Sequence, residues 1–222
     1  MSLARFKDFC IDAVDAARLG EFWAAALHLD LHHLDNGDVY LTGPTEAHTI
    51  WINQVPEPKT VKHRVHLDVH GASVEEMEAL GATVVDAESF RWTVMLDPEG
   101  GEFCLFIREA PPDYRLHEIV VDCVDHGTMS RWWEGLVGGH RVDDPRGFAY
   151  LESIPNVPFE GISFVPVPEP KTAKNRIHVD VTTDDLQSVV AAGATVHRER
   201  DDEVGWTVLS DPEGNEFCAF TS

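Results

Sequence analysis

The sequence has few cysteines and no long apolar runs, and each shortage excludes a class of protein. Four cysteines in 222 residues are too few for a disulfide scaffold. No apolar run approaches the roughly 18–20 residues that a membrane span needs. The first residues also lack the apolar core of a signal peptide. We therefore expect a cytoplasmic globular protein with no membrane partner.

Positive charge is also scarce. Lysine and arginine together number 17 against 39 aspartates and glutamates, which gives a formal net charge of −22. A surface this negative repels phosphate backbones and anionic lipid. We therefore expect a small-molecule ligand or substrate as the partner, and neither a nucleic acid nor a membrane.

An internal repeat organises the chain. The segment Val55–Val69 recurs as Val167–Val181, with eleven identities in fifteen positions. Trp92–Phe106 recurs as Trp206–Phe220, again with eleven identities in fifteen. Prolines in the stretch 109–113 suit a short, stiff connector. The repeat predicts two copies of one domain, residues 1–110 and 115–222.

Each half contains a smaller repeated unit. Phe9 and Ile11 alternate with polar residues as in a strand, and Asp15 stands where the N-cap of a helix over 16–27 would lie. Short strands follow around 39–42 and 49–53. The order then restarts, with strands and helices expected at 64–69 (strand), 74–80 (helix), 83–85, 91–96 and 102–107 (strands). We expect four βαβββ units in the whole chain.

Strand alternation predicts which face carries chemistry. In the strand 64–69, His66 and Asp68 lie opposite the apolar residues, and His178 and Asp180 repeat this pattern in the second half. Of the twelve histidines, only these two recur between the halves. Two interpretations stay open: metal ligation, or a structural hydrogen bond to the aspartate that follows.

Cysteines and carboxylates extend this polar face. Cys104 and Cys218 correspond between the halves, and each is either a small core residue or a thiolate ligand. We interpret Cys10 and Cys123, which have no counterpart, as packing residues. Asp8 and Glu118 lie on the corresponding face of the first strand in each half.

Basic and aromatic residues gather near the same face. Four of the five lysines lie in the two loops that precede the histidine strands, where they either neutralise acidic neighbours or attract an anionic substrate. The aromatic residues that could line a ligand pocket, if they are not core residues, are Trp51, Trp92, Phe148, Phe164 and Trp206.

These motifs resemble the vicinal oxygen chelate superfamily, which includes glyoxalase I, bleomycin-resistance proteins and extradiol dioxygenases. The resemblance rests on the Pro-Glu-Pro-Lys loops, the Arg-x-His-x-Asp strands, and the Asp-Pro-Glu-Gly turns before the last strand of each half. It implies an α+β fold with four tandem βαβββ modules. These modules form curved, barrel-like mixed sheets with helices outside, and the fused copies form an internal pseudo-dimer from one chain, which could also pair as a homodimer.

The resemblance also implies a ligand set that this chain matches only in part. His66 and His178 match the histidine ligand position, whereas the first-strand position is Asp8 or Glu118 and the last-strand position is Cys104 or Cys218. The fourth strand offers no carboxylate. Histidine, carboxylate and thiol donors together suit zinc better than nickel, iron or manganese.

Two functions follow as hypotheses. In the first, a divalent metal is held by Asp8, His66 and Cys104 in one half and by Glu118, His178 and Cys218 in the other, and assists a lyase, isomerase or dioxygenase. Glu102 or Glu216 is then the catalytic base. In the second, the protein is a metal-free binder that sequesters a small molecule, with Asp68, Asp180 and the tryptophans contacting it. One half could also be degenerate and serve only to complete the sheet.

Overall fold

A computed structural model describes residues 2–221, and this part of the chain folds into four βαβββ modules. The first half consists of β1 (Arg5–Ala13), α1 (Ala16–Leu27), β2 (Asp30–His33), β3 (Val39–Thr42), η1 (Glu46–His48), β4 (Ile50–Gln54), β5 (Val65–Gly71), α2 (Val74–Leu80), β6 (Thr83–Asp86), β7 (Thr93–Leu96) and β8 (Glu102–Ile107). The second half consists of β9 (Leu116–Cys123), α3 (His126–Val137), β10 (His140–Asp144), β11 (Phe148–Glu152), β12 (Gly161–Pro166), β13 (Ile177–Thr183), α4 (Leu186–Ala191), β14 (Thr195–Arg198), β15 (Thr207–Ser210) and β16 (Glu216–Thr221).

Local sequence signals account for most of these elements. The helix α1 begins after Asp15, whose side chain accepts a hydrogen bond from the Arg18 N–H at 3.1 Å, and it ends at His28 in a left-handed conformation. The sequence pattern does not locate β2. None of its four side chains is fully buried, so it lacks the apolar alternation that marks a half-buried strand.

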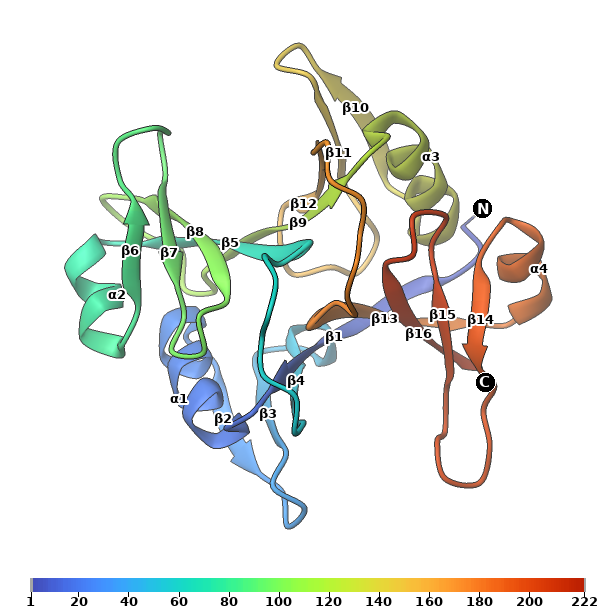
Figure 1. Cartoon of the computed structure of the whole chain (residues 1–222), viewed down its shortest axis with the longest axis horizontal. Helices are drawn as coiled ribbons and strands as arrows, with labels where there is room; N and C mark the ends of the chain where they lie inside the picture. The colour runs from blue at the N-terminus through green and yellow to red at the C-terminus, as the bar shows by residue number, and fades with distance from the viewer. Residues whose placement is uncertain (1, 222) are drawn as a thin grey trace.

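The strands form two eight-stranded sheets, and each sheet takes one module from each half. Sheet A has the order β14-β15-β16-β13-β1-β4-β3-β2, and sheet B has the order β10-β11-β12-β9-β5-β8-β7-β6. The antiparallel pairs β1–β13 and β5–β9 join the halves at the centre of each sheet. Figure 1 shows these pairs lying across the middle of the molecule, with helices at the periphery. The expected α+β fold of four modules in curved mixed sheets is confirmed, and neither sheet closes into a barrel.

The helices cover one face of the sheets and build the cores. Phe22 and Trp23 of α1 contact Phe103 of sheet B, with ring centroids 5.8 and 5.5 Å apart, although α1 follows a strand of sheet A. In the second half, Trp133 of α3 contacts Phe217 of sheet A in the same way. Because these rings are buried, burial of apolar surface ties the two modules of each half together, and the opposite face of each sheet is left for polar side chains.

Candidate functional site

The concave face of sheet A gathers five polar or thiol side chains from three neighbouring strands. In the β1–β13 ladder, Asp8 pairs with Asp180 and Cys10 pairs with His178. In the β13–β16 ladder, Asp180 pairs with Cys218. We call these residues the sheet A cluster. Side chains at adjacent ladder positions point to the same face, so residues from opposite ends of the chain meet here.

The side chains of the sheet A cluster lie close together. His178 Nε2 lies 3.5 Å from Asp180 Oδ1 and 3.5 Å from Cys218 Sγ. Cys10 Sγ donates to Asp180 Oδ2 at 3.5 Å. Buried Asp8 Oδ1 and Asp180 Oδ1 have no hydrogen-bond partner among the described residues. The cluster therefore holds unused acceptor capacity in a buried place.

Burial sets the electrostatics of this cluster. It raises the pKa of Asp180 well above the usual range, and the neighbouring Asp8 carboxylate raises it further. It also raises the pKa of the Cys10 and Cys218 thiols, with Asp180 adding to both shifts, and it lowers the pKa of His178. Near neutral pH these shifts favour protonated thiols and a neutral imidazole.

Sheet B carries an equivalent cluster. His66 Nε2 lies 3.5 Å from Asp68 Oδ1 and 3.7 Å from Cys104 Sγ. Glu118 pairs with Asp68 in the β5–β9 ladder, and its Oε2 accepts from Ser163 Oγ at 2.5 Å. Burial favours a lower pKa for His66, but the hydrogen bond and charge of Asp68 outweigh it and raise the pKa. We call His66, Asp68, Cys104 and Glu118 the sheet B cluster.

The sequence-based grouping of these residues within each half is wrong. Asp8 lies beside His178 and Cys218, whereas Glu118 lies beside His66 and Cys104. The cause is the topology, because β1 pairs with β13 and β9 pairs with β5. Each cluster is thus built from both halves of the chain.

Cys10, which the sequence led us to interpret as a packing residue, is buried and also contacts Asp180 of the sheet A cluster. Its thiol, His178 and Asp180 place their potential ligand atoms within 4.8 Å of one another. Its counterpart in sheet B is Val120, which pairs with His66 as Cys10 pairs with His178. Alternation in β1 puts Cys10 on the same face as Asp8, whereas the equivalent position of the other sheet has no cysteine.

Two hollows open on the concave face of sheet A. The first has a volume of about 540 Å³, and its lining includes Cys10, His178, Asp180, Cys218, Trp51, Trp206 and Phe220. The second, of about 940 Å³, is lined by Asp8, η1 and the stretch 156–158. Lys7 and Trp51 line both hollows. A small organic molecule would fit the first hollow, with aromatic rings on its wall and the cluster at its base.

The predicted aromatic residues have different surroundings. Trp51 donates from Nε1 to Asp8 Oδ2 at 3.2 Å, and Trp206 packs against Phe220 with centroids 5.4 Å apart. Trp92 stacks on Phe106 in sheet B at 5.4 Å. Phe164 is fully buried in the hydrophobic core, so its expected role in ligand contact is wrong. It lies on the opposite face of β12 from Ser163, which contacts the sheet B cluster.

The two glutamates expected to act as bases are both engaged. Glu102 accepts from Lys59 Nζ at 2.8 Å and from the His63 N–H at 3.0 Å. Glu216 accepts from Lys171 Nζ at 2.7 Å and from the Asn175 N–H at 3.1 Å. Burial favours a higher pKa for Glu102, yet these hydrogen bonds outweigh it and lower the pKa. Both carboxylates therefore anchor the loops before the histidine strands.

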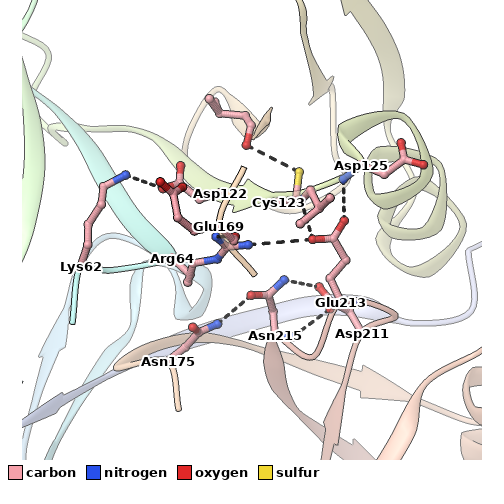
Figure 2. Close-up of polar contacts among 12 residues, drawn as sticks. Lys62, Arg64, Asp122, Cys123, Asp125, Glu169, Asn175, Asp211, Glu213 and Asn215 are labelled. Carbon is pink, nitrogen blue, oxygen red and sulfur yellow. Dashed lines mark hydrogen bonds and ion pairs between the residues drawn. The ribbon is translucent and has the colours of Figure 1, made fainter. Parts of the chain in front are cut away.

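Those loops face each other across a central cleft of about 550 Å³. Lys62 bonds to Asp122 at 2.5 Å, and Lys174 bonds to Asp12 at 2.5 Å. Figure 2 shows the Lys62 pair and the contact of Arg64 with Glu213, 4.0 Å apart, which links the halves. The lysines of these loops therefore neutralise neighbouring carboxylates. Asp12 and Lys174 also line the hollow of about 540 Å³, so their ion pair separates the cleft from that hollow.

The donor set of the sheet A cluster fits a zinc-class ion. With bonds of about 2.0–2.3 Å, tetrahedral nitrogen, oxygen and sulfur ligands lie about 3.3–3.6 Å apart. His178 Nε2 lies 3.5 Å from both Asp180 Oδ1 and Cys218 Sγ, and one ligand atom each of Cys10, His178 and Asp180 lies within 4.8 Å of the others. The unpartnered Asp180 Oδ1 supplies an available oxygen donor. The ligand atoms of His66, Asp68 and Cys104 in sheet B also lie within 4.8 Å of one another, so this group fits a zinc-class ion as well.

A family model described as a glyoxalase-like domain matches the chain twice, over residues 8–106 and 118–220. The chain belongs to the glyoxalase-like domain family. Membership confirms the resemblance to the vicinal oxygen chelate superfamily and the tandem arrangement of its repeat. No curated protein matches this glyoxalase-like chain at a significant level.

Solved structures share its fold. Glyoxalase I from Zea mays is similar with a TM-score of 0.72 at 14% sequence identity, covering 97% of this chain and 92% of that one. The cppA protein from Streptococcus pneumoniae TIGR4 is similar with a TM-score of 0.54 at 10% identity, covering 100% and 99%. At these identities the likeness concerns the fold of the glyoxalase-like chain. Within residues 2–221, no helix is both long and apolar enough to cross a membrane.

Proposed function

We propose that this glyoxalase-like chain is a divalent-metal-dependent enzyme of the lyase, isomerase or dioxygenase type, which acts on a small molecule in the hollow of sheet A. One observation carries the proposal. Potential ligand atoms of Cys10, His178 and Asp180 lie within 4.8 Å of one another on the lining of a hollow of about 540 Å³. Family membership supports the reaction class by analogy.

In this proposal, His178, Asp180 and Cys10 hold the ion, and Cys218 lies 3.5 Å from the imidazole as a further donor. The bound ion supplies Lewis-acid polarisation of neighbouring substrate oxygens. Cys10 would have to lose its thiol proton to bind the ion as a thiolate, and metal binding would release that proton to solvent.

Aromatic and cationic side chains bind and orient the substrate. Trp51, Trp206 and Phe220 supply apolar wall to the hollow. Lys7 lies over the Phe220 ring with its Nζ 4.4 Å from the centroid, and also bonds to Asp8. Its charge lies where negative charge on a substrate oxygen would be stabilised.

Asp8 is a positioning residue in this proposal, because it lines the hollow of about 940 Å³ and not the substrate hollow of about 540 Å³. Its Oδ2 accepts from Trp51 and Lys7, which fixes the carboxylate, while its buried Oδ1 has no partner among residues 2–221. Glu216 lines the substrate hollow and is the proton acceptor in this proposal. Lys171 and the Asn175 N–H occupy its two oxygens, so Lys171 must move away before Glu216 can reach a substrate proton.

A metal-free binding protein is the second candidate, and the electrostatics favour it. Burial raises the pKa of both thiols and of Asp180, so the sheet A cluster carries little net charge without a cation. The same hollow and the same tryptophans would then sequester an aromatic or cationic small molecule.

Elemental analysis of untagged, chelator-free protein separates the two candidates. The enzyme proposal expects about one equivalent of zinc-class metal per cluster, and loss of the sheet A equivalent in His178→Ala. Substitution of an exposed histidine outside every cluster, His140→Ala, is the matched control and keeps the full metal content. No bound metal, with no thermal stabilisation when zinc is added back, would transfer the assignment to metal-free binding. Ligand-dependent quenching of tryptophan fluorescence would then be the assay.

A further inference from the structure

A third group of potential ligands lies at the other end of the β5–β9 pair in sheet B. His70 of β5, His117 of β9 and Glu160, which precedes β12, place ligand atoms within 4.8 Å of one another. Glu160 Oε1 lies 3.4 Å from His70 Nε2 and 3.2 Å from His117 Nδ1. The two imidazole rings have centroids 4.5 Å apart.

Backbone irregularity brings these side chains together. The β5–β9 register shifts between Asp68 and Val69, whose partners are Glu118 and Leu116, so His117 is the extra residue of a bulge. A bulge re-aims the side chain that it carries. The Glu160 N–H donates to the His117 carbonyl at 2.8 Å, which holds Glu160 beside that imidazole.

The group combines burial with access. The side chain of His70 is 5% exposed, that of His117 is 16% exposed, and that of Glu160 is 70% exposed. The buried His117 Nδ1 makes no hydrogen bond, even though Glu160 Oε1 is 3.2 Å away. His117 Nδ1 and Glu160 Oε1 are therefore close to each other without a hydrogen bond between them. Two atoms that bind the same metal ion have this arrangement.

We propose that His70, His117 and Glu160 form a metal site for a zinc-class divalent ion, separate from the two concave clusters. The separations of 3.4 and 3.2 Å match the roughly 3.3 Å between nitrogen or oxygen ligands of a tetrahedral ion with bonds of about 2.0 Å. Two imidazoles and one carboxylate suit zinc or cobalt, and no thiolate is involved. Three protein ligands leave the fourth position for water or a small ligand.

The internal repeat argues that these residues are not needed for the fold. In sheet A, Thr182 of β13 occupies the place of His70, and Lys7 of β1 occupies the place of His117. The same bulged pairing of strands therefore forms without either imidazole. The repeat also supplies a conservative test, since His70→Thr with His117→Lys copies residues that the fold already accepts.

Titration of the metal-free whole chain with cobalt, and then zinc competition, tests the site. We expect a cobalt spectrum from this site without the sulfur charge-transfer band that the thiol-containing clusters would give. The His70→Thr, His117→Lys variant loses this component and one equivalent of metal, while His66→Ala retains both. Glu160→Gln changes a side chain that is 70% exposed, so we expect the fold to tolerate it and metal binding to weaken about tenfold or more.

These experiments test the third site separately from the sheet A and sheet B clusters. If the double variant folds with an unchanged melting temperature and binds as many equivalents of metal as the parent, the proposed site is wrong. An unchanged zinc affinity of Glu160→Gln would overturn it as well. If His178→Ala and His66→Ala leave the metal content unchanged while the double variant loses its equivalent, the site stands and the proposed enzyme function falls.

Discussion

Asp8 and Asp180 face each other across the β1–β13 ladder, one from each half of the chain. Their carboxyl groups meet in a buried place, and the charge of Asp8 helps to raise the pKa of Asp180. Neither half alone can form this pair, since the two strands come from the first and the last module. Each polar cluster is therefore shared between the two halves of the chain.

Sharing of sites predicts which substitutions are coupled. Asp8→Asn and His178→Ala disturb the same cluster, so their effects on metal affinity or ligand affinity combine non-additively. Asp8→Asn and His66→Ala act in different sheets and combine additively, although both residues belong to the first half. Isothermal titration of the single and double variants measures this. Coupling of Asp8 with His66 in place of His178 would contradict the topology.

The Cys10 thiol is predicted to bind metal as part of the sheet A cluster. Cys10→Val installs the residue that sheet B carries at the equivalent position, Val120, so the fold should tolerate it. We expect metal affinity at this cluster to fall about tenfold or more, because one of its three grouped ligands is lost. The converse variant, Val120→Cys, is expected to strengthen binding at the sheet B cluster. Unchanged affinity in Cys10→Val would return Cys10 to a packing role.

A hydrogen-bond chain complete in the second half is interrupted in the first. Asn175 donates to Asn215 at 3.0 Å, and Asn215 donates to Asp211 at 2.9 Å, as Figure 2 shows. The equivalents are His63, Gly101 and Asp97. Both ring nitrogens of His63 lack partners, and a Cβ on Gly101 would lie 2.8 Å from His63 Cε1.

Repairing that chain is predicted to stabilise the fold. Gly101→Asn alone should destabilise by about 1–3 kcal/mol, because it overpacks the His63 ring. The double variant with His63→Asn reproduces the second half, and should be more stable than either single variant. Urea unfolding of all four proteins gives the coupling free energy. If the effects of the two substitutions on the free energy of unfolding simply add, His63 and Gly101 are not coupled and the proposed repair is wrong.

His63 and Asp97 are expected to change the stability of the fold in opposite directions as pH changes. Burial lowers the pKa of His63 to about 4, so the unfolded state binds more protons and stability falls as pH drops from about 6.5 to 4. Burial raises the pKa of Asp97 to about 6, so its contribution is present at low pH and is lost as pH rises toward 6. Removing His63 should therefore make the protein relatively more stable at pH 4.5 than the parent. Parallel stability–pH curves for the parent and His63→Asn would contradict this.

Glu99 is predicted to be a structural link between the halves. It accepts from the Val14 and Asp15 N–H groups at 2.9 and 2.6 Å and lies 3.3 Å from Arg176 of the other half. Glu99→Gln removes the charge at constant shape, and should cost about 1–3 kcal/mol of unfolding free energy. Glu213→Gln is the matched variant, with a smaller expected cost because Arg64 lies farther away, at 4.0 Å. If Glu99→Gln and the parent unfold at the same urea concentration, Glu99 does not link the halves.

The sequence allowed the modules and most of the elements to be predicted. Alternation placed His66, Asp68 and their repeats on one face, and the N-cap at Asp15 located α1. These signals are local, so they survive in a single sequence.

The partners of those residues could not be predicted in the same way. Strand order depends on how modules pair in space, and either pairing preserves the same alternation. The sequence therefore groups Asp8 with His66, although Asp8 lies beside His178 in the structure. The grouping of His70, His117 and Glu160 cannot be predicted from the sequence, because it depends on a bulge that no residue pattern marks.

Diffraction data collected at the zinc absorption edge from zinc-loaded crystals test the central claim most directly. The account predicts an anomalous peak within bonding distance, about 2.0–2.3 Å, of His178, Asp180 and Cys10, with ligands from both halves of the chain. A well-ordered zinc-loaded crystal with no peak at the sheet A cluster would contradict it.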